Sequence, residues 1–390
     1  MSAELKRTLE NHERWRREQC LNLIASENVT SPAVRKILGS DLGHRYTATD
    51  HFYMGCKFIN QAETIARELV RDVFGSEWAD VTPLSGHITD MTLLSTFARR
   101  GDKILTMSTE YGGYFGTSET GFPRILGLVN LYFPFDKDRW NIEIEKTVEL
   151  IASEVPRLVI LGASYILFPH PVQQIAKACR ETGTMLAFDG SHVMGLIAGG
   201  AFQQPLKEGA RILVGSTHKS FFGPQGGIIA GFKPEGERMK ETIFPAIMDN
   251  AHWNRIAALA QALLEMKKFG RKYAAQVIRN SRALAAALDE RGIPVRCKDY
   301  GYTASHQVLL DMDRLKDSAQ VPDKLEHANV IVDRGIRLGT SEMTRRGMRE
   351  GDMNDVAEII AKVIRSQETV NSARRKATAL ARKFRQVRYA

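Results

Sequence analysis

The chain has 390 residues and a mass of 43.7 kDa, which is enough for one large domain and a smaller one. Its composition, 43% hydrophobic and 25% charged, is typical of a globular protein. No apolar run reaches the roughly 18–20 residues that a membrane-spanning helix needs, and the polar N-terminal segment lacks the apolar core of a signal peptide. We therefore expect a cytoplasmic protein that binds no membrane.

The formal net charge is +9, and much of the positive excess lies within residues 374–388. These basic residues have no interleaved pattern of aromatic side chains for base stacking and no accompanying nucleic-acid-binding motif, so the segment indicates a solvated helix face. The four cysteines are far apart and lack the paired spacing of a metal site, which is typical of free thiols in a reducing compartment. We expect neither a nucleic-acid partner nor a bound metal.

The first part of the chain predicts alternating helices and strands. A helix over residues 3–19 leads into an extended segment over 21–28. Apolar strands follow at 79–82, 103–107, 158–162, 185–188, 211–214 and 227–230, with helices at 64–74, 87–99 and 172–182. Strands that alternate with helices indicate a mostly parallel sheet covered on both faces.

From about residue 250 the pattern changes to Ala- and Leu-rich helices, predicted over 253–269 and 273–288. A smaller α+β region follows, with strands near residues 295–297, 307–312 and 335–338. We therefore expect an N-terminal arm over residues 1–30, a large domain over 31–250 and a small C-terminal domain over 251–390.

Two residues at predicted strand ends indicate the chemistry. Lys219 follows the strand at 211–214 in a glycine-rich turn, and active sites of open α/β sheets lie at the carboxyl ends of strands. A lysine there can form a Schiff base with an aldehyde; the alternative is an ordinary surface lysine. Asp189 ends the strand at 185–188, where a carboxylate can pair with the ring nitrogen of pyridoxal phosphate or merely cap the next helix.

Two further segments have weaker signals. Residues 85–87 (Ser-Gly-His) open a predicted helix, and the free N–H groups of a helix start suit a phosphate, although a serine there also serves as a cap. Arg337 lies on a predicted strand of the small domain, where an arginine can hold a carboxylate by two parallel hydrogen bonds. Nothing local separates it from Arg345 or Arg346 in this role.

Together these segments resemble the serine hydroxymethyltransferase family of fold-type I pyridoxal-phosphate enzymes. The matching stretches lie in the family order between about residues 20 and 350: Leu23-Ile-Ala-Ser-Glu-Asn28, Arg45-Tyr46, Phe52-Tyr53-Met-Gly-Cys56, Ser85-Gly86, Asp189-Gly-Ser-His192, Thr217-His-Lys219, Gly223-Pro-Gln-Gly-Gly227 and Gly335-Ile-Arg337. The resemblance implies a large α/β domain with a mostly parallel seven-stranded sheet, a smaller C-terminal α+β domain and pyridoxal 5'-phosphate as cofactor.

The resemblance also implies roles for matched residues. The implied cofactor-binding residues are Ser85, Gly86, His87, Tyr111, Asp189, His192, Ser216, His218 and Lys219, with Tyr46, Gly226 and Gly227 reaching the phosphate of the neighbouring subunit in a homodimer. Ser26 and Arg337 form the implied clamp for the substrate carboxylate, joined by Tyr53, and the implied catalytic residues are Lys219, His192, Tyr111 and Tyr53. Tyr111 replaces a histidine that stacks on the cofactor ring; it can stack but cannot exchange protons near neutral pH.

Three departures concern tetrahydrofolate. Ala48 stands where the family has a glutamate tied to folate-assisted transfer, and Asp50 could replace that glutamate only from a shifted loop. The segment 329–334 runs almost directly into Gly335, without the family's loop that closes on the pterin. The arginine of the family's GPRGG run is Gln225. The resemblance therefore favours a member that works without folate.

The expected function is pyridoxal-phosphate-dependent retro-aldol and aldol chemistry on β-hydroxy-α-amino acids through a glycine quinonoid, in a folate-independent L-threonine transaldolase or aldolase. One alternative is a folate-dependent serine or α-methylserine hydroxymethyltransferase. Others are a pyridoxal-phosphate racemase, transaminase or decarboxylase, and a non-catalytic homologue, which the retained lysine, aspartate and arginine disfavour. The candidate bases are His192, a phenol, a water and Glu110. The sequence leaves open whether dimers pair into tetramers.

Overall fold

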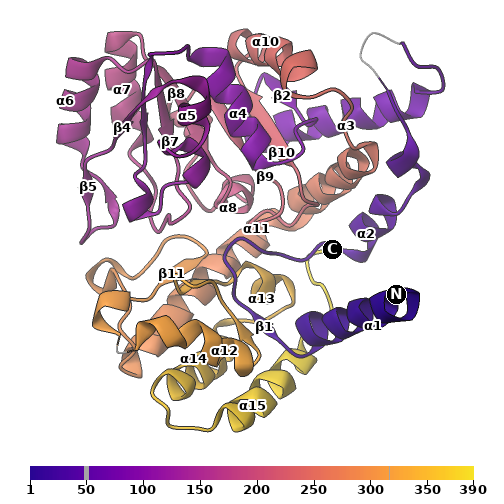
Figure 1. The fold of residues 1–390 in the computed structure, drawn as a ribbon, viewed down its shortest axis with the longest axis vertical. Coiled ribbons are helices and arrows are strands. Elements are labelled where there is room, and N and C mark those ends of the chain that lie inside the picture. Colours follow the sequence, from indigo (N-terminus) through magenta and orange to yellow (C-terminus); the bar gives the residue numbers. More distant parts are fainter. Residues whose placement is uncertain (48–51, 316) are drawn as a thin grey trace. The chain divides into compact units, whose positions relative to one another are not determined.

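The computed structural model describes residues 1–47, 52–315 and 317–390 (Figure 1). The chain divides into two compact units. Unit 1 comprises residues 1–29 and 275–389, and unit 2 comprises residues 30–274 with the terminal Ala390. The change of composition near residue 250 falls close to the start of α11 (Trp253–Glu290), whereas the two units divide within this helix. The N-terminal segment is grouped with the C-terminal part of the chain.

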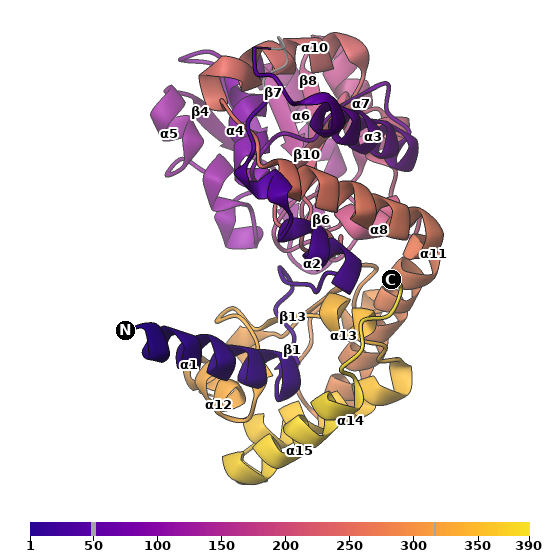
Figure 2. The same ribbon diagram turned by 90° about the vertical axis from the view of Figure 1, so that its right-hand side faces the viewer.

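Unit 2 contains a seven-stranded sheet in the order β2-β10-β9-β8-β7-β3-β4. β10 is antiparallel to both neighbours, and the other pairs are parallel. The strands are β2 (Trp78–Asp80), β3 (Lys103–Thr106), β4 (Val129–Tyr132), β7 (Leu158–Leu161), β8 (Met185–Asp189), β9 (Ile212–Ser216) and β10 (Gly227–Gly231). Strands β7, β9 and β10 are buried throughout, as expected where helices cover both faces (Figures 1 and 2). The predicted mostly parallel α/β sheet is confirmed.

The seventh strand, β4, has no counterpart among the strands located from the sequence. It lies at the edge of the sheet, paired with β3 alone. Its residues are partly or fully exposed and include the polar Asn130. An edge strand therefore lacks the continuous apolar run that marks the central strands.

Helices of unit 2 follow the predicted alternation. They are α2 (Pro32–Leu38), α3 (Lys57–Phe74), α4 (Gly86–Phe97), α5 (Phe122–Leu126), α6 (Ile144–Glu154), α7 (Val172–Thr182), α8 (Met194–Ala198), α9 (Pro205–Glu208) and α10 (Lys233–Thr242). A small hairpin joins β5 (Phe135–Asp136) to β6 (Asn141–Ile142). Short 3-10 and π segments lie at Asp41–His44, Thr109–Tyr111, Phe115–Thr117 and Ile243–Ile247. In the part of the chain that the structure describes, none of the helices is long and apolar enough to span a bilayer.

Helix α11 is continuous where two helices were predicted. Gly270 lies inside it, and a Cβ built on Gly199 would approach Gly270 O to 2.5 Å. Gly199, which follows α8, therefore packs directly against the backbone of α11 at Gly270 because it has no Cβ. Packing, rather than intrinsic helix propensity, accounts for the uninterrupted helix.

Unit 1 joins both ends of the chain. Strand β1 (Leu21–Asn22) pairs in parallel with β12 (Val330–Ile331), and β11 (Gln307–Leu309) pairs antiparallel with β13 (Arg337–Gly339). The strand predicted near 295–297 is only an isolated bridge between Val295 and Leu310. The helices are α1 (Ser2–His12), the π segment Glu13–Arg17, α12 (Val321–His327), α13 (Ser341–Arg345), α14 (Glu350–Ile364) and α15 (Val370–Lys383), with 3-10 turns at Lys298–Tyr300, Met312–Arg314 and Ser318–Gln320.

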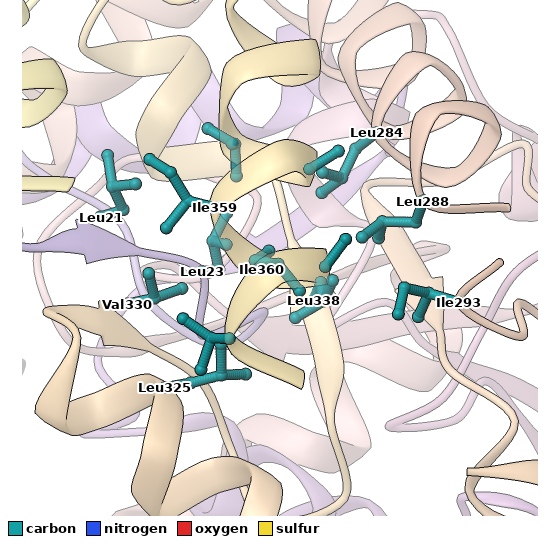
Figure 3. Close-up of a cluster of buried hydrophobic side chains, with 14 of the residues drawn as sticks. Leu21, Leu23, Leu284, Leu288, Ile293, Leu325, Val330, Leu338, Ile359 and Ile360 are labelled. Atoms are coloured by element: carbon teal, nitrogen blue, oxygen red, sulfur yellow. The ribbon is translucent and has the colours of Figure 1, made fainter. Parts of the chain in front are cut away.

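One apolar core holds unit 1 together. Figure 3 shows its central side chains, which come from strands and helices far apart in the sequence. Leu21 and Leu23 of the N-terminal segment pack there beside Leu338 of β13 and Ile360 of α14, and all four are fully buried. In contrast, α1 has no buried residue. The N-terminal segment therefore contributes to the unit through residues that follow its first helix.

Candidate active site

Lys219 lies in a loop held closed by Thr217. The N–H of Thr217 donates to Gly226 O at 3.0 Å, its carbonyl accepts from Gly223 N–H at 2.8 Å, and its Oγ1 donates to Pro224 O at 2.6 Å. Because β9 ends at Ser216, this loop presents the half-buried Lys219 at the carboxyl end of that strand. The lysine occupies the position where ligands bind to open parallel sheets.

Asp189 ends β8, the parallel neighbour of β9. Its Oδ1 accepts from Ser191 N–H at 2.9 Å, which fixes the carboxylate at the same edge of the sheet as the lysine loop. Ser191 also joins the two strand ends, because its Oγ accepts from Ser216 N–H at 3.0 Å and from Ser216 Oγ at 3.4 Å. The next residue, His192, is buried. One network of backbone and serine groups thus positions the predicted carboxylate and the predicted lysine.

The start of α4 meets this network. Ser85 caps the helix, and its Oγ accepts from Ile88 N–H at 3.2 Å. A Cβ added to Gly86 would lie 2.4 Å from Ser216 Oγ and 3.0 Å from Ser191 Oγ, so only glycine allows this approach. Gly86 and His87 belong to the first turn of α4, where the N–H groups have no acceptor within the helix and can bind an anion.

The tyrosine expected to stack on the cofactor has aromatic and charged neighbours. The rings of Tyr111 and Phe135 are parallel, 4.7 Å apart, and Lys137 Nζ lies 5.0 Å from the Tyr111 ring centre. Lys137 also donates to Glu110 Oε1 at 3.1 Å, and this bond lowers the pKa of Glu110. Glu110, one of the candidate bases, is therefore an exposed, ion-paired carboxylate.

Two groups near the strand ends were not identified from the sequence. Tyr114 shares a 2.5 Å hydrogen bond with His87 Nδ1, and burial together with Asp90 and Asp189 raises its pKa. Asp90 is buried in α4, and burial together with Asp189 raises its pKa well above the usual range, against the opposing effect of Lys219. The local sequence of α4 contains no signal that distinguishes Asp90 from a solvent-exposed acid.

The residues assigned to a neighbouring subunit pack as follows. A Cβ on Gly226 would lie 2.5 Å from Nη1 of the buried Arg255, and Gly227 N–H donates to Pro83 O at 3.0 Å. Tyr46 and Tyr53 form an edge-to-face pair with ring centres 5.3 Å apart, and 50% and 40% of their surfaces are exposed. Ala48 and Asp50, which bear on the folate glutamate, lie outside the described residues.

The substrate-clamp candidates belong to unit 1. Arg337 is 7% exposed, and its Nη2 lies 3.1 Å from Asp333 Oδ2. The segment that contains Ser26 runs beside β13, where Gly339 N–H donates to Leu23 O at 2.7 Å. The strand thus brings Ser26 and Arg337 onto neighbouring stretches of chain.

The other two arginines have different surroundings. Arg345 is fully buried and donates from Nη1 to Tyr389 O, and its carbonyl accepts from Arg388 N–H at 2.7 Å. Arg346 pairs with Glu342 at 2.7 Å and donates to Arg17 O at 2.9 Å. Arg345 therefore binds backbone groups near the C-terminus, and Arg346 binds one near the N-terminus. This difference from Arg337 could not be read from the sequence.

The groups in unit 2 fit pyridoxal phosphate. A lysine for the aldehyde, a carboxylate for the ring nitrogen and a helix start whose Gly86 leaves room for close approach all lie at the carboxyl end of one sheet. This combination of sheet and site defines a pyridoxal-phosphate enzyme of fold type I.

Comparison with known proteins specifies the family. The family model "Serine hydroxymethyltransferase" matches residues 2–360. The serine hydroxymethyltransferase of Methanopyrus kandleri is 39% identical over 98% of this chain and 94% of its own length, and that of Methanocella arvoryzae is 41% identical over 95% and 92%. The chain belongs to the serine hydroxymethyltransferase family, and its cofactor is pyridoxal phosphate.

A solved structure is also similar. The crystal structure of L-threonine transaldolase from Pseudomonas fluorescens in the internal aldimine state superposes with a TM-score of 0.91 and 28% identity, covering 98% of this chain and 91% of that one.

Proposed function

We propose that the chain is a folate-independent L-threonine transaldolase or aldolase that performs retro-aldol and aldol chemistry on β-hydroxy-α-amino acids. The observation that carries the proposal is the short connection between β12 and β13. A turn in which Ile336 N–H donates to Asp333 O at 3.0 Å leads directly into Arg337. Residues 332–336 leave no room for the loop that, by the family resemblance, closes on the pterin.

The comparisons support two readings of the reaction. The similar solved structure is named as a threonine transaldolase, which agrees with a reaction that uses no folate. The curated relatives are named serine hydroxymethyltransferase, so a folate-dependent hydroxymethyltransferase acting on serine or α-methylserine is the rival. The short β12–β13 connection favours the first reading.

The cofactor-binding residues of unit 2 have defined tasks in this proposal. Bound pyridoxal phosphate supplies an electron sink for the bonds at the amino-acid Cα. Lys219 Nζ holds the cofactor covalently, Asp189 keeps the proton on its ring nitrogen, and the start of α4 binds its phosphate. Tyr111 offers a ring face for stacking.

The substrate requires a carboxylate site and a base. Arg337 with Ser26 binds the amino-acid carboxylate, since an arginine matches two carboxylate oxygens. Retro-aldol cleavage requires removal of the β-hydroxyl proton, for which His192, Tyr53 and a water are candidates. The raised pKa of Tyr114 keeps its phenol protonated, so this residue acts as a hydrogen-bond donor.

The test uses the purified holoenzyme with L-threonine and an added aldehyde, without folate. We expect acetaldehyde and a new β-hydroxy amino acid, both measured by chromatography. The Lys219→Ala variant should abolish both products, whereas Lys177→Ala, at an exposed position of α7, should leave them unchanged. The absence of both products would refute the proposal, and conversion of serine only with tetrahydrofolate would establish the rival.

We also propose a homodimer with shared active sites. Met54 and Phe58 are 92% and 73% exposed, next to the half-exposed Tyr46 and Tyr53, and an apolar stretch of this kind is typical of an interface. Lys219→Ala and Tyr46→Ala subunits, each inactive alone, should regain part of the activity when mixed, because a hybrid dimer would contain one intact site. Inactive mixtures of confirmed hybrid dimers would contradict shared sites.

A further inference from the structure

Asp90 is a buried acid to which the proposed reaction assigns no task. It lies in α4, is 1% exposed, and its Oδ1 has no hydrogen-bond partner among the described residues. An unsatisfied carboxyl in a protein interior is costly and requires an explanation. Its position in the helix indicates one.

Asp90 shares a helix face with Gly86 at the start of α4. Residues four apart lie on the same helix face, and side chains point toward the helix start, so Asp90 points back along the face of Gly86. Gly86 contacts Ser191, because an added Cβ would lie 3.0 Å from its Oγ. The N–H of Ser191 donates to Asp189 Oδ1 at 2.9 Å. Asp90 therefore lies on the face of α4 whose start meets the turn that fixes Asp189.

The charged and titratable groups around Asp90 come from three elements. They are Asp189 at the end of β8, Lys219 in the loop after β9, and the phenol of Tyr114. Burial and Asp189 favour the protonated form of Asp90, and the opposing effect of Lys219 is smaller. Two acids in one buried site do not both ionise readily, and Asp90 is the more buried of the two.

We propose that Asp90 is a positioning residue, a neutral carboxylic acid that donates its O–H to Asp189, so that Asp189 alone carries the charge that pairs with the cofactor ring nitrogen. The inference rests on the cofactor role proposed for Asp189, and not on which amino acid is cleaved. An O–H donor would orient the Asp189 carboxylate without adding charge beside the pyridine ring. Asparagine preserves this arrangement, since it is neutral, equal in size and able to donate an N–H.

The first test measures the melting temperature of the apoprotein against pH. The folded-state pKa of Asp90 is raised above the unfolded value of about 3.9. Ionisation of Asp90 therefore costs no stability below that value and costs progressively more as pH rises toward the folded pKa. The gain in melting temperature of Asp90→Asn over wild type should therefore grow from about pH 4 to pH 7. A difference that does not change with pH would overturn the assignment of a neutral acid. The exposed Asp299→Asn is the control.

The second test uses the bound cofactor, without any amino-acid substrate. In Asp90→Asn, the pH midpoint of the cofactor absorbance and the affinity for pyridoxal phosphate should stay at wild-type values, because no charge is removed. In Asp90→Leu, we expect the midpoint to shift and the affinity to fall about tenfold, as for a loss of about 1.4 kcal/mol. A midpoint shift in Asp90→Asn would show that Asp90 is ionised. If folded Asp90→Leu changes only the melting temperature, the positioning role is overturned.

Discussion

Substituting Gly86 by alanine tests whether the start of α4 is the phosphate site. The added Cβ would lie 2.4 Å from Ser216 Oγ, 3.0 Å from Ser216 N and 3.0 Å from Ser191 Oγ. Ser216 N–H itself donates to Ser191 Oγ, so rotation of one serine side chain cannot relieve the clash. The first turn of α4 must therefore move away from the ends of β8 and β9.

The cost of this movement can be estimated. Adding a methyl group to a well-packed site costs about 1–3 kcal/mol. The N–H groups of Gly86 and His87 belong to the turn that moves, so the cost should appear as weaker cofactor binding. At about 1.4 kcal/mol for each factor of ten, the affinity for pyridoxal phosphate should fall about 5- to 150-fold.

The assay is a fluorescence titration of the apoprotein with pyridoxal phosphate, with circular dichroism to establish that Gly86→Ala is folded. Gly351→Ala is the matched control, because a Cβ at this position, also in the first turn of a helix, meets nothing within 4 Å. We expect the control to bind like wild type. If folded Gly86→Ala binds the cofactor within about twofold of wild type, the phosphate does not depend on this turn and the reasoning is wrong.

Three further predictions concern stability. Leu338→Ala, in the core of unit 1, should lower the free energy of unfolding by about 2–5 kcal/mol in urea titrations. As a control, Leu9→Ala, at a position 58% exposed, should change it by less than about 0.5 kcal/mol. Equal effects of the two substitutions would contradict the burial of Leu338. Glu342→Ala leaves the buried Arg346 without its 2.7 Å ion-pair partner and should lower the free energy of unfolding by about 3–5 kcal/mol in the same assay. A decrease below about 1 kcal/mol would show that the ion pair is dispensable. Burial lowers the pKa of His170 from 6.5 to about 4, so the unfolded chain gains the proton first and stability is lost as pH falls through this window. His170→Asn should reduce the fall in melting temperature between pH 6.5 and pH 4. An unchanged fall would show that another group causes the loss of stability in acid.

Much of the site could be predicted because its residues follow buried strands. The apolar runs of β8 and β9 end abruptly in polar residues, and that ending is enough to identify Asp189 and Lys219 as candidates. The local sequence of Asp90 has no such signal. A single acid in a helix is usually solvent-exposed, and only the packing of α4 against the strand ends buries it. The spacing of apolar residues along α4 therefore does not predict that Asp90 is buried.

Pairing between distant strands could not be predicted either. The extended stretch after residue 20 could be recognised, but its pairing with β12 could not, because strand pairing between distant segments depends on the whole fold. Likewise β4 has the mixed polarity of an edge strand, which resembles that of a loop. The continuous α11 reflects close packing at Gly270, which a propensity argument cannot anticipate.

The pairing of β1 with β12 has a consequence for biosynthesis. Trp15 Nε1 donates to Asn329 Oδ1, a residue 314 positions later, and Leu21 pairs with Val330. Apart from Ala390, unit 2 is continuous in sequence and can begin to fold while the ribosome is still producing the remainder. The N-terminal segment must wait, with Leu21 and Leu23 exposed, until β12 and β13 have been synthesised. Apolar side chains that stay exposed for this long favour aggregation of the nascent chain.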